Sequence, residues 1–274
     1  MLENGEVVTF GCIVNEIDYS SDTSPVSVSC ADGSLFQANF VVVTAPIPVL
    51  RRGDIAFVPP LDDRHQEAID NTRYYPGLKV FLKFNTKFYH DAFALASDFR
   101  NTNHDTGDRY FWDEAQDQPT DQQILGFFAV GTLAEAYIAL SDDEIIDSLL
   151  EELDMMYDDQ ATPAFVDAVV QNWSTEQYIA GAYSNFKNYN NLERLRVPIG
   201  ANGQVLFAGE GVPYIDYEHG FVHGAALSGR SVADHILGRI NGDVDAGTVP
   251  GSSAATTVWS LGLVSIFGWI FVSL

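Results

Sequence analysis

The chain has 274 residues, 46% of them hydrophobic and 12% aromatic, which is enough to bury a core in one large domain or two interleaved ones. Its 38 acidic residues against 14 basic ones give a formal net charge of −24, which argues against nucleic-acid binding. Such a charge suits either a cationic substrate or a well-solvated surface.

The cysteines and histidines do not indicate a metal site. Cys12 and Cys30 fit no zinc site, and we expect core or surface thiols, with a bridge between neighbouring strands as the alternative. The six histidines have no metal-ligand spacing, so no metal site is predicted.

In chain order, the first half predicts short strands and one helix. Strands are expected at 13–17, 26–28, 35–36 and 40–44, a helix at 62–71, and strands at 78–84, 108–112 and 124–130.

An acidic amphipathic helix is predicted next, within residues 141–159, which hold nine carboxylates and no Lys or Arg. Ser141 and Glu144 form a capping-box signal at its start. We interpret the acidic run as a solvated helix face, not a binding site. A further strand should end near Trp173.

The most informative stretch is 205–240. An apolar run at 205–208 predicts a strand that breaks at Gly209-Glu210-Gly211, and small and apolar residues from Phe221 onward repeat at helical spacing. Gly220 has no side chain, so it keeps the entry to the helix narrow. The exposed amides of a helix N-terminus attract an anionic or electron-rich partner. The pattern predicts a strand, a cofactor loop and a helix.

These residues resemble the C-terminal flavin-binding signature of the flavin-containing amine oxidases, the family of monoamine and polyamine oxidases. Gly209-Glu210 matches the family's Gly-Glu pair, and the run 220–229 follows the polyamine oxidase form. Three further blocks resemble the same family: 40–46 with the Pro-Pro of 55–61, the strand 77–84, and 173–184.

The resemblance implies an FAD site. It assigns Glu210 to the ribityl chain, Val222 to the pyrimidine edge and Val14 to the adenine. Ala182 stands where some monoamine oxidases tether FAD through cysteine, so the FAD should be non-covalent. The cofactor-binding residues implied are Val14, Ala45, Pro46, Gly209, Glu210, Gly220, Val222 and Ala225.

Three catalytic residues follow from the same resemblance. Lys79 matches the lysine that holds a water against flavin N5, and Tyr183 and Phe221 match the aromatic walls of the substrate cage. Phe221 replaces a more usual tyrosine, so stacking survives but a phenolic dipole is lost.

The expected fold is α/β (α+β): a partial Rossmann-like FAD-binding domain interleaved with a substrate domain of mixed sheet and helices. Residues 1–53 and 191–240 would form the first domain and 54–190 the second, followed by a polar spacer at 241–257. No Gly-x-Gly-x-x-Gly fingerprint precedes Val7. We therefore interpret the chain as a C-terminal portion that binds FAD poorly in isolation.

The last segment, 258–274, is uncharged and mostly apolar. After a spacer of small residues it is typical of a GPI-attachment signal, with a tail anchor as the competing interpretation. We expect a membrane-attached protein, either GPI-anchored at the cell surface or tail-anchored, unless the segment is only a frayed terminus.

The expected activity is FAD-dependent oxidation of a polyamine-like amine to an imine and aldehyde, with oxygen reduced to hydrogen peroxide. One alternative is an L-amino-acid oxidase of the same fold, which needs an arginine for the substrate carboxylate. A second is a non-catalytic, membrane-attached fragment. The candidate arginines, none in a defined motif, are Arg51, Arg52, Arg73, Arg100 and Arg109.

Overall fold

The computed structural model describes residues 8–94, 108–185, 192–212, 219–250 and 271–273. The chain divides into unit 1, Met1–Arg73 with Ser184–Leu274, and unit 2, Tyr74–Tyr183. The predicted α/β class, with several sheets and helices, is confirmed. The chain passes from one unit to the other after Arg73 and again after Tyr183. Residues 54–73 therefore belong to unit 1, whereas the domain limits predicted from the sequence were 54 and 190.

The first sheet of unit 1 has the order β3-β2-β1-β5. β1 runs antiparallel to β2 and parallel to β5. A disulfide joins Cys12 to Cys30, so the alternative of a bridge is the one the structure contains, and the expectation of free thiols is wrong. The strands are β1 (Val14–Asp18), β2 (Val26–Cys30), β3 (Leu35–Ala38) and β5 (Ala56–Val58).

The second sheet of unit 1 is centred on β4 (Phe40–Val43). β13 (Val205–Phe207) pairs with β4 in parallel, and β14 (Phe271–Ser273) pairs antiparallel with it. The long helix α7 (Val222–Asn241) begins where the sequence predicted. Its Val232 packs with Leu206 and Ala208 in a small core.

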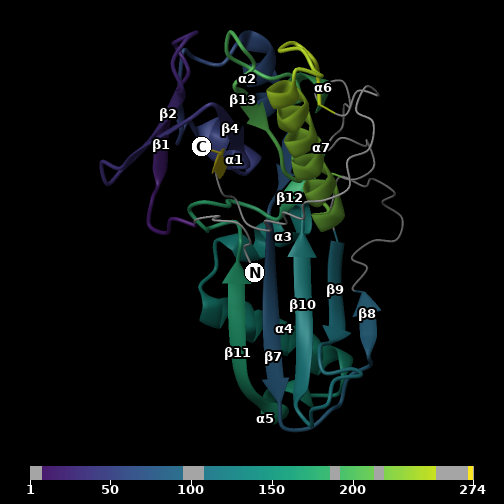
Figure 1. Cartoon of the computed structure of the whole chain (residues 1–274). Coiled ribbons are helices and arrows are strands. Elements are labelled where there is room, and N and C mark those ends of the chain that lie inside the picture. Colours follow the sequence, from purple (N-terminus) through teal and green to yellow (C-terminus); the bar gives the residue numbers. More distant parts are fainter. Residues whose placement is uncertain (1–7, 95–107, 186–191, 213–218, 251–270, 274) are drawn as a thin grey trace. The chain divides into compact units, whose positions relative to one another are not determined.

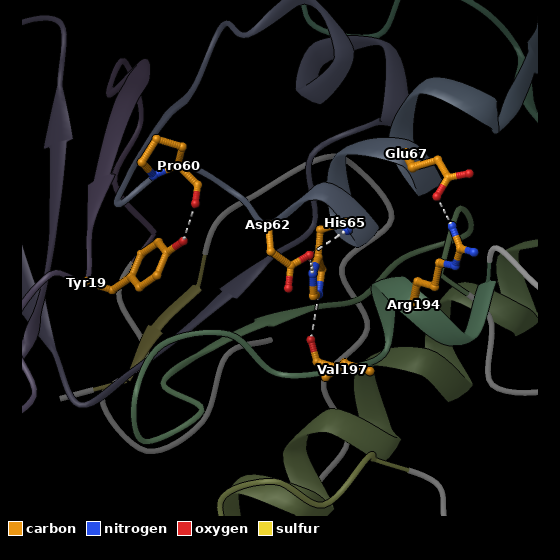
Figure 2. A network of polar contacts seen from close by, with 7 residues as sticks. All are labelled: Tyr19, Pro60, Asp62, His65, Glu67, Arg194 and Val197. Atoms are coloured by element: carbon orange, nitrogen blue, oxygen red, sulfur yellow. Dashed lines mark hydrogen bonds and ion pairs between the residues drawn. The ribbon is translucent and has the colours of Figure 1, made fainter.

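Polar contacts fasten α2 (Asp63–Asn71) within unit 1 (Figure 2). Asp62 caps the helix by accepting from the His65 backbone N–H at 2.9 Å, and His65 Nδ1 lies 2.8 Å from the same oxygen. His65 Nε2 lies 2.9 Å from the Val197 carbonyl, and Arg194 of α6 (Leu192–Leu195) pairs with Glu67. Both ring nitrogens of His65 therefore face oxygen atoms, one on Asp62 and one on Val197.

The cap also sets the charge of Asp62. Burial raises the pKa of this carboxyl, but hydrogen bonds from the His65 backbone and ring outweigh that effect and bring the pKa below its ordinary value. Nearby, Arg51 of α1 (Ile47–Arg52) donates from its Nη2 to the Ile69 carbonyl at 2.8 Å and so ties α1 to α2.

Unit 2 is a sheet of order β11-β7-β10-β9-β8 with helices packed on one face (Figure 1). Leu78, Val80 and Leu82 of β7 alternate into this core, where Leu149 and Leu153 of α4 meet them. The elements are β7 (Gly77–Phe84), β8 (Ala92–Ala94), β9 (Asp108–Asp113), β10 (Gln123–Val130), β11 (Phe165–Asn172), α3 (Thr132–Ile138), α4 (Asp142–Met156) and α5 (Ala161–Ala164).

Two short strands, β6 (Arg73–Tyr75) and β12 (Tyr183–Asn185), pair with each other where the chain passes between the units. Neither strand was predicted from the sequence, and α1, α3 and β8 were not predicted either. The capping box at Ser141 is confirmed: the Glu144 N–H donates to Ser141 Oγ, and the Ser141 N–H donates to Glu144.

Among the described residues, no helix has the length and apolar character needed to cross a bilayer. Residues 258–270 of the apolar C-terminal segment lie outside the described residues. The membrane attachment expected of that segment therefore stays a prediction.

Replacing both cysteines, Cys12→Ala with Cys30→Ala, should lower the free energy of unfolding by about 2–4 kcal/mol, because the bridge restricts the unfolded chain. The bridged residues are 18 apart in the sequence. Urea denaturation measures the loss, and a reductant should destabilise the wild type by a similar amount without affecting the double variant. Two titratable thiols in the native protein would contradict the bridge.

Candidate functional site

Two loops meet at the carboxyl ends of β4 and β13. The parallel register aligns Val43 with Phe207, and the Ala208 N–H donates to the Val43 carbonyl at 3.0 Å. Ala45 and Pro46 follow β4, and Gly209 and Glu210 follow β13, so the pairing brings these two loops to one edge of the sheet. Open α/β sheets bind their ligands at this edge.

Glu210 is the titratable group of the second loop. Its Oε2 accepts hydrogen bonds from Ser184 Oγ at 2.6 Å and from the Ser184 backbone N–H at 3.1 Å. Burial raises the pKa of the Glu210 carboxyl above its ordinary value, and the two Ser184 hydrogen bonds act in the opposite direction. Burial is the larger effect, so the net shift favours the neutral form.

The backbone of the same loop is fixed by α7. The Gly209 N–H donates to Ser228 Oγ at 3.2 Å, and this hydroxyl donates to the Val212 carbonyl at 2.6 Å. Gly209 has a φ of 127°, a conformation that side chains disfavour. A Cβ on Gly211 would lie 2.8 Å from Ile47 Cγ1, so glycine is needed at that position. The loop is therefore rigid on both sides of Glu210.

The entry of α7 presents unmatched backbone donors. Phe221 occupies the N-cap position without a capping side-chain hydrogen bond, and the first turn holds no acidic residue. Phe221 and Val222 are 55% and 61% exposed, and the Phe221 ring stacks on His223 with centroids 5.1 Å apart. Ala225 is half-buried in this turn and donates its N–H to the Phe221 carbonyl at 3.0 Å.

A second polar group lies at the same edge of the sheet. Thr44 Oγ1, directly before Ala45, is buried and has no hydrogen-bond partner among the described residues. An orphaned hydroxyl, a buried carboxyl and an uncapped helix entry are the donors and acceptors that a flavin with its ribityl hydroxyls requires. The residues present fit the cofactor that the resemblance implies.

Lys79 lies in unit 2, on the face of the sheet opposite its helix-covered core. This open face carries the half-buried side chains Lys79, Phe81 and Lys83 of β7, with Trp112 of β9 and Phe128 of β10. The Lys79 ammonium lies 5.9 Å from the Trp112 ring centroid and 5.8 Å from that of Phe128. Both rings stabilise the cation by cation–π attraction.

Gly126 explains how Trp112 reaches this position. A Cβ on Gly126 would lie 2.5 Å from the indole of Trp112, its cross-strand neighbour. The indole therefore lies flat over the glycine and meets Phe81 edge-on, with ring centroids 6.4 Å apart. A side chain at position 126 would lift the indole away from Lys79.

Tyr183 is oriented by its neighbours in unit 2. Its ring meets Tyr75 in a T-shaped contact with centroids 5.8 Å apart, and the preceding Ala182 N–H donates to the Tyr75 carbonyl at 2.7 Å. Gly181 has a φ of 152°, and a Cβ there would lie 2.5 Å from the Tyr74 ring. The close packing selects a small residue before Ala182.

The predicted residues are divided between the units. Unit 1 brings Ala45, Pro46, Gly209 and Glu210 together at the sheet edge, with Gly220 donating its N–H to the Glu210 carbonyl oxygen at 3.4 Å. Val14 lies on β1, in the other sheet of unit 1. Phe221, Val222 and Ala225 lie at the start of α7, and Lys79 and Tyr183 belong to unit 2.

The sequence analysis gave no role to Thr44, Ser184, Ser228 or Trp112. Hydroxyl residues are common, and only the position of Ser184 beside Tyr183 could have drawn attention to it. Within the described ranges, no group of three or more His, Cys, Asp or Glu side chains is arranged to hold a metal ion.

Comparison with known proteins identifies relatives of this arrangement. The sequence profile of the family described as flavin containing amine oxidoreductase matches residues 2–237. The human peroxisomal N(1)-acetyl-spermine/spermidine oxidase is 28% identical over 252 residues, which cover 81% of this chain and 47% of that protein. Polyamine oxidase 1 of Zea mays is 29% identical, over 82% of this chain and 44% of that protein. The chain thus spans less than half of either relative.

Solved structures give the same fold. A triple mutant of putrescine oxidase, made to redesign its cofactor binding, superposes with a TM-score of 0.67 at 20% identity. The match covers 83% of this chain and 48% of that one. A single mutant from the same redesign gives a TM-score of 0.68. At this identity the likeness supports the partial FAD-binding fold.

Gly126→Ala should destabilise the protein by about 1–3 kcal/mol, because the new methyl group displaces the Trp112 indole from its close contact with the strand. Gly229→Ala is the matched control, since a Cβ there meets nothing within 4 Å and alanine favours the helix. Urea unfolding compares the two variants. Equal stabilities of the Gly126 variant and the wild type would show that the indole does not lie where the structure has it.

Proposed function

Because the chain belongs to the family of flavin-containing amine oxidoreductases, we propose that it is the part of an FAD-dependent amine oxidase that holds the flavin end of the cofactor and the substrate. The observation that carries the proposal is the rigid loop at the end of β13, where Glu210 lies between Ser184 and the entry of α7. The remaining cofactor contacts would come from a dinucleotide-binding segment outside this chain.

The protein's own groups have separate roles in this reaction. FAD, when bound, supplies the oxidising power by accepting two electrons from the amine. Glu210 would accept a hydrogen bond from a ribityl hydroxyl, and the N–H groups of the first turn of α7 would stabilise negative charge at the pyrimidine edge. Lys79 would hold a water molecule for proton transfer, and Tyr183 and Phe221 would flank the amine.

The proposed substrate is a polyamine-like amine. It loses two electrons and two protons to give an imine, which hydrolyses to an aldehyde, while oxygen becomes hydrogen peroxide. The net charge of −24 favours the approach of a polycation, and the half-buried rings on the open face of unit 2 provide apolar contacts for its methylene chain. The names of the relatives, spermine/spermidine oxidase and polyamine oxidase, support the same class.

The described arginines do not favour an amino-acid substrate. Arg51 donates to the Ile69 carbonyl, Arg52 pairs with Asp54 at 2.5 Å, and Arg109 pairs with Glu152 at 3.2 Å. Each guanidinium is already engaged by the protein. Arg100 lies outside the described residues.

We further propose that the protein passes through the secretory pathway to a membrane-attached, GPI-anchored state, with tail anchoring as the alternative. The support is the disulfide Cys12–Cys30, since disulfides persist in oxidising compartments, together with the apolar segment 258–274 behind its spacer of small residues.

Lys79→Met should slow amine-dependent reduction of bound flavin by roughly 10²–10⁴-fold, the range of a lost proton-transfer group. Lys83→Met is the matched control, because Lys83 lies on the same face of β7, four residues further along the strand. Stopped-flow absorbance of the flavin, in the full reading frame with its dinucleotide-binding segment, measures the rate. Equal slowing by both variants would point to the charge of this face instead of a specific role for Lys79.

Phosphatidylinositol-specific phospholipase C should release the protein from the surface of cells that express the full reading frame, because this enzyme cleaves a GPI anchor but not a peptide span. Immunoblotting of the medium measures the release. Retention in carbonate-washed membranes after the treatment would favour a tail anchor, and recovery in the soluble fraction without any treatment would overturn membrane attachment.

A further inference from the structure

We propose that Ser184 is the positioning residue of the flavin loop: its hydroxyl and backbone N–H hold one oxygen of Glu210, which leaves the other oxygen for a hydroxyl of the cofactor. The inference rests on the proposed function, because it deepens the role of Glu210 in that site. Neither Ser184 nor its contact was assigned a role by the sequence pattern.

The geometry is a two-donor clamp on a single atom. Ser184 Oγ and the Ser184 N–H lie 2.6 and 3.1 Å from Glu210 Oε2. The hydroxyl also lies 3.4 Å from the Glu210 main-chain carbonyl, but its one proton serves the much shorter contact. Ser184 is 0% exposed, so solvent does not compete for these bonds. Two donors from one residue hold the Glu210 side chain in one orientation.

The second oxygen, Oε1, receives neither of the Ser184 hydrogen bonds, and the Gly220 backbone N–H also favours the charged form of the carboxyl. The lone pairs of Oε1 can accept from a ligand hydroxyl. The loop backbone is held in this position because Ser228 Oγ accepts from the Gly209 N–H and Gly211 packs against Ile47. A carboxyl whose Oε2 is held by two fixed donors is pre-organised for a ligand at its other oxygen.

Ser184 also controls whether this carboxyl carries a proton. Burial favours the neutral form, and the short bond from the hydroxyl favours the charged form. His219, which also favours the charged form, is the other titratable group that acts on Glu210. Removal of the Ser184 hydroxyl should raise the pKa of Glu210 further, so the group would stay neutral to a higher pH.

The experiment compares the wild type with Ser184→Ala, Ser184→Thr and the control Thr72→Val, all in the full chain. Thr72→Val removes another buried hydroxyl of unit 1, one that donates to the Ala68 carbonyl at 2.7 Å, away from the loop. Carbon-13 NMR of labelled glutamate follows the Glu210 titration without cofactor, with Glu210→Gln to assign its signal. Flavin fluorescence gives the dissociation constant for added FAD.

We expect Ser184→Ala to titrate at higher pH and to bind FAD about tenfold more weakly, the effect of one hydrogen bond of average strength. Ser184→Thr should restore both values, and Thr72→Val should change neither. An unmoved titration in Ser184→Ala, or a threonine variant that behaves like the alanine variant, would overturn the role of the hydroxyl. An unchanged FAD affinity beside a shifted titration would overturn its role in cofactor binding. Failure of the full reading frame, with its dinucleotide-binding segment, to bind FAD would defeat the proposed function, while the titration still decides whether Ser184 positions Glu210.

Discussion

The parallel pairing of β4 with β13 is the constraint on which the candidate cofactor site depends. Val41 pairs with Val205, and all of unit 2 lies between these residues in the sequence. Ordering so long a connection has a high entropic cost, which the chain reduces by folding most of it into a separate unit with its own core. Once the strands pair in parallel, their carboxyl ends coincide, and the loops after Val43 and Phe207 must lie side by side.

Burial of the Glu210 carboxyl is the second physical requirement of this edge. A carboxyl removed from water is destabilised unless donors replace the lost hydration. The protein supplies these donors from Ser184. The Ser228 hydroxyl accepts from the Gly209 N–H and donates to the Val212 carbonyl, and both serines are fully buried. The polar groups of this loop form hydrogen bonds with fixed serine side chains. A ligand therefore does not have to reorganise the loop when it binds.

The sequence predicted those elements that show a local pattern of apolar, polar and glycine residues. The structure confirms three such local patterns: the alternation over β7, the amphipathic spacing of α4 with its capping box, and the glycine-rich break after β13. The disulfide, the Ser184 clamp and the indole over Gly126 join residues that are distant in sequence, so no local pattern encodes them. The short strands β6 and β12 were not predicted, because three residues are too few to show a periodic pattern.

The division of the predicted residues between two units has a consequence for how such a site can vary. In unit 1, the proposed cofactor contacts involve the loop after β13, the two buried serines and the entry of α7. These groups are hydrogen-bonded to one another, so a change in one affects the others. The open face of unit 2 is less constrained: Trp112, Phe128 and Phe81 are half-buried, and the contacts of Trp112 and Phe128 with Lys79 need only an aromatic ring at a suitable distance. Under the proposed function, aromatic exchanges on this face would change which amine is accepted without altering the proposed cofactor contacts, provided that position 126 keeps room for the indole.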